Sequence, residues 1–421
     1  MIQEAQTSTK IRPLPQPEPG LTVDTLVSRA AALQPLLRAQ QADNDKAGRY
    51  SEELHQAFKD AGFYRIMQPK IFGGYQMDPS VFLKVVMEIA RGHPASGWCF
   101  CLGGSHAFFI GSHYSIEAQA ELFGEDGEFR AAQVVFPGAG TSMTPVDGGY
   151  IVDGVWPFAS GIPISTHFIG GGLVFKDGAP PAHIFFTVPV EQIQILPDWG
   201  GDRFMGMQAS GSNSVKLDKV FVPERLTIPA DMLTTSATFP EGSRGYLAHG
   251  DPIYQGPLVG WFHCEFAAIL SGTARAALED FAHQAKTKPI LGQPDRMRRE
   301  DPFVQNVYGR ALGMADSAEA LTFAAIERLG EMKRVAARDK TAISLEQTLT
   351  IWGMARQACV MACDAVDLLF HNVGATVGRS DQKLQRYYRD IEMYRVHIQS
   401  QPTMPTMRGQ VELGAPGRLA L

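Results

Sequence analysis

The sequence lacks most of the short motifs that mark nucleotide and metal sites. It contains no G-x-G-x-x-G opening a helix, no G-x-x-x-x-G-K-[ST], no H-E-x-x-H and no C-x-x-C. The run Gly170–Gly172 stands inside an apolar, strand-like stretch, which is the wrong context for a pyrophosphate turn. These absences argue against a nicotinamide site of the Rossmann type within this chain.

Cysteine and long apolar runs are also scarce. Five cysteines, an odd number, argue against a disulfide framework and for a reducing compartment. No apolar run reaches about 18 residues, so no membrane-spanning helix is expected. The first residues carry no apolar segment of the kind found in signal peptides. We therefore expect a cytoplasmic protein that does not enter a membrane.

A metal site is not expected either. Cys99 and Cys101 have C-x-C spacing and His106 follows nearby, but their neighbours are apolar and predict the inside of a helix. The charge balance is mild, with 38 Lys and Arg against 44 Asp and Glu, and no basic stripe is present. This balance argues against a nucleic-acid partner.

The apolar pattern predicts helices, then a β domain, then a helical bundle. A proline-rich flexible arm over 1–20 precedes an N-terminal helical domain over 21–129, in which Ser51 and Asp78–Pro79 are typical helix starts. Residues 130–230 read as short strands and turns, and 231–256 as a linker. Helical periodicity returns over 257–400, followed by a tail over 401–421. Predicted strands and helices do not alternate along the sequence, and this pattern predicts an α+β protein rather than a doubly wound sheet.

Four ordered segments carry the chemical signal. They are Gly97-Trp98 with Gly104-Ser105-His106, the strand end W-P-F-A-S-G over 156–161, the loop G-M-Q-A-S-G-S-N-S over 206–214, and the last bundle helix L-Q-R-Y-Y-R-D with Tyr394 and His397 behind it. Together with P-x-x-x-G-G over 69–74, these segments resemble the acyl-CoA dehydrogenase superfamily. The last helix departs from the Tyr-Glu-Gly context of the dehydrogenases. It resembles instead the oxygenase components of two-component, group D flavin monooxygenases, a family that includes p-hydroxyphenylacetate hydroxylase and related phenol and indole hydroxylases.

The resemblance implies a fold and an activity. The fold would be acyl-CoA dehydrogenase-like, with an N-terminal helical domain, a central β-barrel or sandwich and a C-terminal four-helix bundle. The enzyme would use reduced flavin and O2, through a C4a-hydroperoxyflavin, to hydroxylate a small phenolic or indolic substrate. FMN is expected over FAD on family grounds, a separate NAD(P)H:flavin reductase would supply it, and a homotetramer is usual for the fold.

The resemblance also assigns roles to residues. Ser160 would meet the flavin N5 and O4 edge, His397 would lie near the flavin and the oxygen, and His106 would bind or deprotonate a substrate hydroxyl. Further cofactor contacts are expected from Trp156, Phe158, Ser210, Gly211, Ser212 and, for the phosphate, Arg275, Arg298 and Arg299. The substrate pocket is expected to include Trp98, His106, His113, Phe136, His263 and Tyr394.

Several alternatives stay open at this point. His113 lies close enough to His106 in sequence that either can be the substrate histidine. N- or S-oxygenation replaces ring hydroxylation if the substrate lacks an ionisable hydroxyl. The main rival is a flavin dehydrogenase of acyl thioesters, which needs a carboxylate base, and Glu392 is the only glutamate in the terminal motif. A scaffold that has lost its flavin is the remaining alternative.

Overall fold

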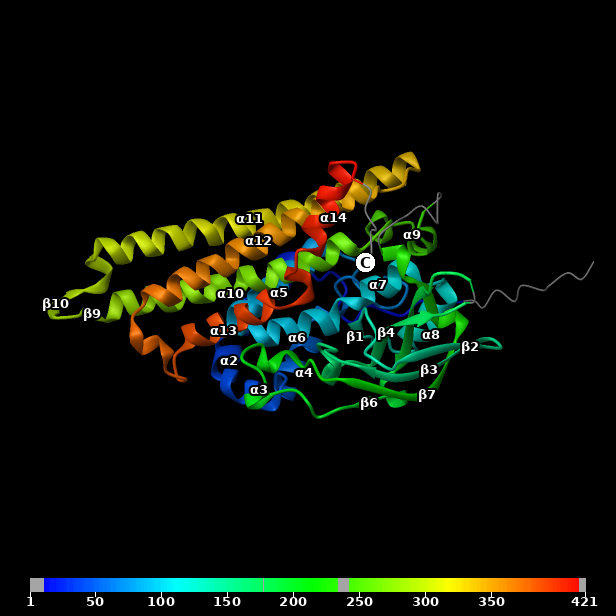
Figure 1. Ribbon diagram of the computed structural model, residues 1–421, viewed down its shortest axis with the longest axis horizontal. Coiled ribbons are helices and arrows are strands. Elements are labelled where there is room, and N and C mark those ends of the chain that lie inside the picture. The colour runs from blue at the N-terminus through cyan, green and yellow to red at the C-terminus, as the bar shows by residue number, and fades with distance from the viewer. Residues whose placement is uncertain (1–10, 177, 234–241, 416–421) are drawn as a thin grey trace, which may run out of the picture.

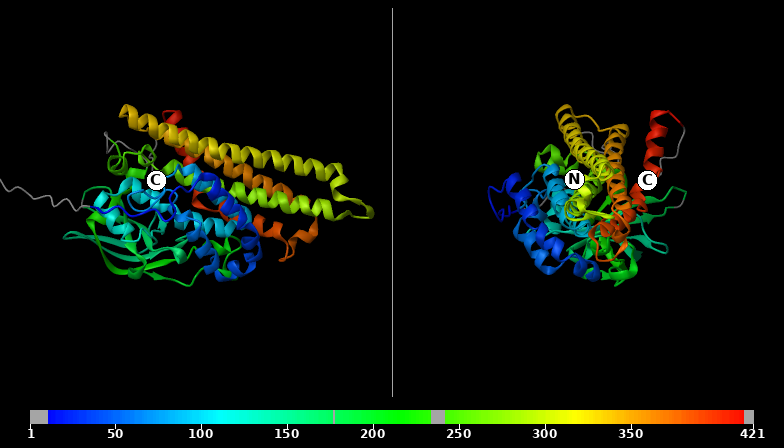
Figure 2. Two further views of the ribbon diagram at one scale, coloured as in Figure 1. Left: turned by 180° about the vertical axis from the view of Figure 1, so that it is seen from behind. Right: turned by 90° about the vertical axis from the view of Figure 1, so that its left-hand side faces the viewer.

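The computed structural model describes residues 11–176, 178–233 and 242–415. Figure 1 shows a β domain at one end of the molecule, helices of the N-terminal domain in the middle, and a long helical bundle that runs past them. The view from behind in Figure 2 shows the same arrangement, with the longest helices extending well beyond the strands. The order of helical domain, β domain and bundle confirms the predicted fold class.

The N-terminal helices begin where the sequence predicts. The Ser51 hydroxyl accepts a hydrogen bond from the Leu54 N–H at 3.2 Å, and Asp78 Oδ1 accepts one from the Ser80 N–H at 2.9 Å. Pro79 occupies the first helical position after Asp78, where its missing N–H costs nothing. The helices are α1 (Val23–Ala32), α2 (Gln34–Ala39), α3 (Gln41–Ala47), α4 (Glu52–Asp60), α5 (Pro79–Gly92), α6 (Pro94–Gly104), α7 (His106–His113) and α8 (Ile116–Phe123).

The described part of the predicted flexible arm contacts the helical domain. The Leu14 N–H donates to the Ile71 carbonyl at 2.9 Å, the Gln16 amide donates to the Gly74 carbonyl at 2.8 Å, and Glu18 pairs with Arg29 at 2.8 Å. Three polar contacts therefore join residues 11–20 to the helical domain. Residues 1–10 lie outside the described part.

The β domain consists of two four-stranded sheets. One has the order β1 (Ala131–Val134), β4 (His167–Val174), β5 (Ala182–Pro189), β8 (Thr227–Pro229), with β1 parallel to β4 and the other pairs antiparallel. The other has the order β2 (Ser142–Val146), β3 (Gly149–Trp156), β7 (Val215–Pro223), β6 (Gln194–Ile195) and is antiparallel. Contacts of β2 with β4 and of β5 with β7 stack the sheets face to face.

The bundle consists of α10 (Val259–Thr287), α11 (Pro302–Asp339), α12 (Leu345–Asn372) and α13 (Lys383–Arg395). A short hairpin of β9 (Pro289–Ile290) and β10 (Gln293–Met297) joins α10 to α11, at the end of the bundle far from the β domain (Figure 1). Buried alanines allow close approach of α10, α11 and α12. Within the described residues, no helix is both long and apolar enough to cross a bilayer.

Two predicted connecting segments contain helices. The described part of the linker over 231–256 includes α9 (Arg244–His249) and the short η8 (Pro252–Tyr254), and the tail over 401–421 includes α14 (Thr403–Glu412). The residues at 234–241 and 416–421 lie outside the described part. Ser243 explains the start of α9, because its hydroxyl accepts from the Tyr246 N–H.

Helix α6 positions the functional side chains. Almost every residue of α6 is buried, as expected of a helix that is apolar on all sides and enclosed by the fold. It contacts α5, α10, β1, α13 and the loop that contains Gln208–Ser210. Side chains from the N-terminal domain, the β domain and the bundle therefore meet along this one helix.

Candidate active site

The W-P-F-A-S-G turn lies directly on α6. Gly161 adopts a φ of 81°, and a Cβ atom there would lie 2.7 Å from the backbone nitrogen of Gly103. Only glycine tolerates both the left-handed conformation and this close approach. The turn is thereby held with Ser160 beside Trp98.

Three serines and a tryptophan form a continuous hydrogen-bonded relay. The Trp98 Nε1–H donates to Ser160 Oγ at 3.1 Å, Ser160 and Ser212 share a bond of 2.7 Å, and Ser212 and Ser210 share one of 2.6 Å. An indole N–H can only donate, so Ser160 accepts from Trp98. If Ser210 donates to Ser212 and Ser212 to Ser160, the proton of Ser160 remains free for a further acceptor.

Aromatic side chains extend the site onto α10 and the end of α13. The Trp98 ring lies 4.9 Å from that of Phe266 and 5.5 Å from that of His397, centroid to centroid. Phe266 and His397 lie 5.2 Å apart. One turn earlier on the same face of α10, Phe262 lies 6.2 Å from His106. Phe262 and Phe266 of α10 therefore form an apolar wall, which the predicted residues Trp98, His106 and His397 all adjoin.

His397 presents a hydrogen-bond donor. Its Nδ1 accepts from the Gln399 N–H at 3.2 Å, so in the neutral ring the proton resides on Nε2. Burial lowers the pKa of His397 to about 4, and the ring is neutral near pH 7. This tautomer is assigned from the hydrogen-bond partners.

His106 presents the opposite tautomer. Its Nδ1 faces the carbonyl oxygens of Ala131 at 2.7 Å and Leu102 at 2.9 Å, and must carry the proton. The Nε2 of the neutral ring is therefore an acceptor. Burial lowers the pKa of His106, and the two carbonyls act in the other direction.

His263 and Tyr394 lie behind the α10 wall. His263 is fully buried, its ring centroid lies 6.1 Å from that of Phe266, and its Nε2 is hydrogen-bonded to the Trp352 indole N–H. Tyr394 lies 6.1 Å from Phe266, and its hydroxyl has no hydrogen-bond partner among the described residues. Burial lowers the pKa of His263 and raises the pKa of Tyr394, so both remain uncharged.

The two aromatics of the strand-end motif face opposite ways. Trp156 is fully buried, its indole N–H donates to the Gly171 carbonyl at 2.8 Å, and it packs on Phe186 inside the β domain. Trp156, from which the sequence predicts a cofactor contact, is therefore enclosed by protein in this structure. Phe158 is 59% exposed and lies 6.1 Å from Trp199 and 6.3 Å from Phe204. It presents an open aromatic surface next to Ser160.

The 206–214 loop contributes two hydroxyls to the site. Ser210 and Ser212 are buried members of the relay. The Gly211 N–H donates to the Gly48 carbonyl at 2.8 Å, and a Cβ atom at Gly211 would lie 2.8 Å from Pro163. The close approach at Gly211 is therefore to Pro163 of the same chain, and the Gly211 N–H is already hydrogen-bonded to Gly48.

The three predicted phosphate-binding arginines lie away from this turn within one chain. Arg275 pairs with Asp316 and Glu319 of α11, both at 2.7 Å. Arg298 donates to the Val373 carbonyl at 2.6 Å, and the exposed Arg299 follows it at the hairpin end of the bundle. The chain alone does not bring these cations to Ser160.

Two predicted pocket residues are also not joined to the relay. Phe136 is 44% exposed and stacks on His183 of β5 at 5.6 Å. His113 is buried beside Phe109, its Nε2 has no partner among the described residues, and burial lowers its pKa to about 3. Of the two candidate histidines, His106 is the one beside the α10 wall.

The structure adds two acidic residues that the sequence reading missed. Asp390 of α13 accepts from the Met207 N–H, and burial together with the charge of Asp45 raises its pKa to about 7. Glu265 is buried in α10, and burial raises its pKa to about 8. An isolated acid within an apolar stretch was the available signal for Glu265.

The rival base Glu392 pairs with Arg395 at 2.9 Å on α13. No cluster of metal-ligating side chains occurs among the described residues.

Comparison with known proteins agrees with this architecture. Residues 27–122 match the N-terminal domain and residues 264–402 the C-terminal domain of acyl-CoA dehydrogenase. The chain is 28% identical over 403 residues to the flavin-dependent monooxygenase oxygenase subunit HsaA of Rhodococcus jostii, covering 93% of this chain and 98% of that protein. It is 25% identical to the oxygenase component of p-hydroxyphenylacetate 3-hydroxylase of Acinetobacter baumannii, covering 90% and 86%.

Solved structures share the fold. The crystal structure of 3-HSA hydroxylase from Rhodococcus sp. RHA1 superposes with a TM-score of 0.82 at 27% identity, covering 93% of this chain and 98% of that one. XiaF from Streptomyces sp., solved with FADH2 and glycerol, gives a TM-score of 0.83 at 22% identity over 94% and 97% of the two chains. TdsC from Paenibacillus sp. A11-2, solved with FMN and indole, gives 0.74 at 20% identity over 94% and 100%.

The two domain matches together span more than half of the chain. The chain therefore belongs to the acyl-CoA dehydrogenase family, and over almost its whole length it is similar to the oxygenase subunit of a flavin-dependent monooxygenase. The sequence expectation of this family is confirmed.

Proposed function

We propose that this chain hydroxylates a small phenolic or indolic substrate with O2 and a reduced flavin bound against the Ser160 turn. The observation that carries the proposal is the relay from Ser210 to Trp98, which ends beside His397. When bound, reduced flavin supplies the electrons and the position at which O2 is activated. The protein supplies binding, orientation and a dry environment.

The residues at the turn fit a flavin ring. Ser160 is half-buried, and it can offer its proton to a ring acceptor when Ser212 donates to it, because Trp98 and Ser212 then occupy its lone pairs. Phe158, Trp199 and Phe204 supply apolar surface beside it. Phe266 and Trp98 exclude water on the bundle side. The flavin ring is flat and has polar atoms on one edge, so its edge suits the Ser160 hydroxyl and its faces suit the aromatic side chains.

The two histidines support different tasks. His106, with its Nε2 lone pair, accepts the hydroxyl or indole proton of the substrate and raises the electron density of the ring. His397, with its Nε2–H, donates a hydrogen bond to the oxygen that is transferred. The Ala131 carbonyl fixes His106 as the acceptor, and the Gln399 N–H fixes His397 as the donor. Both tautomers are therefore set before a ligand binds.

The flavin is proposed to be FMN, delivered by a separate NAD(P)H:flavin reductase. The related proteins are named as oxygenase subunits or components, which implies a partner that reduces the flavin. FADH2 is the alternative, because related structures were solved with each flavin. The named substrates of the relatives are aromatic, in keeping with the apolar wall of Trp98, Phe262 and Phe266.

The phosphate is proposed to be bound by a second subunit of a homotetramer. Arg298 and Arg299 directly follow β10, and Figure 1 shows β10 at the end of the bundle far from the β domain. These arginines therefore serve a flavin only across a subunit boundary. Guanidinium groups suit phosphate oxygens.

The experiment is an anaerobic titration followed by isotope labelling. Calorimetry with reduced FMN and reduced FAD identifies the preferred flavin. The complex is then mixed with ¹⁸O2 and a panel of phenols and indoles, and the products are analysed by mass spectrometry. One ¹⁸O atom in a hydroxylated product supports the proposal. Binding without labelled product for any substrate, combined with oxidation of acyl-CoA by an artificial acceptor, would favour the dehydrogenase instead.

A further inference from the structure

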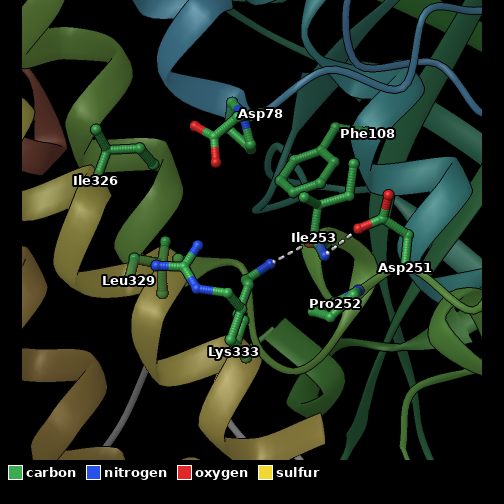
Figure 3. Close-up of a pocket in the computed structure, with 11 residues that line it drawn as sticks. Asp78, Phe108, Asp251, Pro252, Ile253, Ile326, Leu329 and Lys333 are labelled. Atoms are coloured by element: carbon green, nitrogen blue, oxygen red, sulfur yellow. Dashed lines mark hydrogen bonds between the residues drawn. The ribbon is translucent and has the colours of Figure 1, made fainter.

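A separate cavity lies between the bundle and the N-terminal domain. It has a volume of about 140 Å³ and is bounded by α5, α11 and η8 (Figure 3). No member of the serine relay lines it. Its lining residues of interest are Asp78, Phe108, Ile253, Leu329, Gly330 and Lys333.

Lys333 is the distinctive group of this cavity. Its side chain is 2% exposed, and its Nζ donates to the Ile253 carbonyl at 2.9 Å. The same nitrogen lies 4.8 Å from the centre of the Phe108 ring. No ion pair joins Lys333 to a carboxylate in the part of the chain that the structure describes. Figure 3 shows the amine reaching toward Ile253 from α11, with Asp78 and Phe108 across the cavity.

The charged neighbours of Lys333 are engaged elsewhere. Asp78 accepts from the Ser80 N–H, Asp251 accepts from the Ile253 N–H and the Gln76 amide, and Arg334 pairs with Glu331. From α7 and α9, His113 and Arg244 add no negative charge. Burial lowers the pKa of Lys333 to about 7, with the charge of Asp78 acting in the other direction. A larger share of this lysine than of an exposed lysine is thus a neutral amine at neutral pH.

We propose that the Lys333 cavity is a second ligand site that captures small apolar aldehydes as imines on the lysine amine. The cavity walls of Phe108, Ile253 and Leu329 suit an alkyl chain, and Lys333 supplies the only primary amine among the lining residues. The site is independent of the flavin site and of the proposed hydroxylation.

The capture step balances without any oxidant. The Nζ lone pair forms a bond to the aldehyde carbon while the C=O π electrons move to oxygen. The nitrogen then loses its two protons to that oxygen, through solvent or the Asp78 carboxylate, and the oxygen departs as water. The product is a C=N bond, and hydrolysis reverses the step.

Reductive trapping tests the proposal on the full-length protein. Butyraldehyde and cyanoborohydride are added at pH 7, and each lysine is quantified by peptide mass spectrometry. Exposed lysines are almost fully protonated at this pH, so Lys333 should be alkylated at least about tenfold faster than the exposed Lys340. Alkylation of Lys333 no faster than that of Lys340 would overturn the proposal.

A cavity-filling variant supplies the matched control. Gly330 lies in α11, and a Cβ atom there would meet only the flexible end of Arg334 at 3.3 Å and Asp78 at 3.9 Å. Gly330→Leu should therefore fold, fill the cavity and remove the rate advantage of Lys333 while leaving reduced-flavin binding unchanged. Retained fast alkylation in this variant would show that reactivity does not depend on the cavity and would contradict the proposal.

Discussion

The backbone N–H of Met207 donates to the Asp390 carboxylate at 2.6 Å, joining two positions that are 183 residues apart. The preceding residues strengthen this junction. A Cβ atom at Gly206 would lie 2.2 Å from the Arg389 carbonyl, and the Arg389 guanidinium donates to the Met205 carbonyl at 2.6 Å. Met207 itself adopts a φ of 50°, which is costly for a residue with a side chain. Helix α13 therefore holds the loop that carries Ser210 and Ser212.

The first prediction concerns the pH dependence of this junction. Because the folded-state pKa of Asp390 is raised to about 7, its contribution favours the folded state at low pH and is lost as pH rises from about 4 through 7. Asp390→Asn keeps an acceptor for the Met207 N–H and cannot ionise. Its melting temperature relative to the unaltered protein should rise more at pH 8 than at pH 5. Glu392→Gln, which alters a partly exposed pair on the same helix, should show no such difference.

The second prediction concerns the relay. Ser160→Ala removes the hydroxyl that accepts from Trp98 and bonds to Ser212. One lost hydrogen bond is worth about 1 kcal/mol, so the dissociation constant for reduced flavin should rise about fivefold by calorimetry. Ser165→Ala is the control, because that hydroxyl donates to the Gly161 carbonyl and takes no part in the relay. Equal effects of both variants would assign Ser160 a structural role alone.

The third prediction concerns His397. Its Nε2–H is proposed to contact the transferred oxygen. His397→Ala should therefore lower the rate of hydroxylation by about 10²-fold. The yield of hydroxylated product per flavin oxidised should fall with it. Flavin affinity should change little. His397→Gln retains a side-chain N–H donor and should keep more of the yield. Because the pKa of His397 is about 4, its titration should not alter activity between pH 6 and 8.

The fourth prediction concerns subunit sharing. Arg299→Ala and Ser160→Ala should each weaken flavin binding when pure. If the site is built from two subunits, mixed oligomers of the two variants contain some sites with both residues intact. Flavin affinity in a refolded mixture should then partly recover, as measured by calorimetry. A mixture that behaves as the average of its parts would contradict a flavin site shared between subunits.

The fifth prediction concerns acid stability. The folded-state pKa of His113 is lowered to about 3 by burial, so its neutral form stabilises the fold above pH 6.5 and this contribution is lost as pH falls toward 3. The loss approaches about 1.4 kcal/mol per pH unit below 6.5. His113→Leu should therefore lose less unfolding free energy between pH 7 and 5 in urea titrations. His371→Gln, on the exposed side of α12, should behave like the unaltered protein.

The sequence predicts the parts of the fold that local chemistry controls. The helix starts at Ser51 and Asp78–Pro79 follow from capping chemistry, and the structure confirms both. The orientation of Trp156 and Phe158 did not follow from the motif. Two positions apart in a strand they would share a face, but the strand ends at Trp156 and Phe158 turns outward with a φ of 62°.

The remaining features depend on contacts between distant segments. Nothing near Asp390 in the sequence indicates that its carboxylate reaches Met207. The distance of Arg298 from Ser160 follows from the length of α10 and of the hairpin beyond it, which sequence periodicity predicts only approximately. The tautomers of His106 and His397 are set by Ala131 and Gln399, and only three-dimensional placement reveals those partners.

The relay of hydroxyls also has a direction. An acceptor placed at Ser160 draws its proton outward, so that Ser212 donates to Ser160 and Ser210 donates to Ser212. A donor placed at Ser160 reverses the chain and leaves the Ser210 proton pointing into the loop. The polarity of whatever contacts Ser160 is thereby transmitted to Ser210, whose N–H bonds to the Met207 carbonyl. Ser212 bonds to both other serines, so the direction of the relay depends on which of them it donates to. Ser212→Ala would remove both bonds and disconnect Ser160 from Ser210, with both serines left in place.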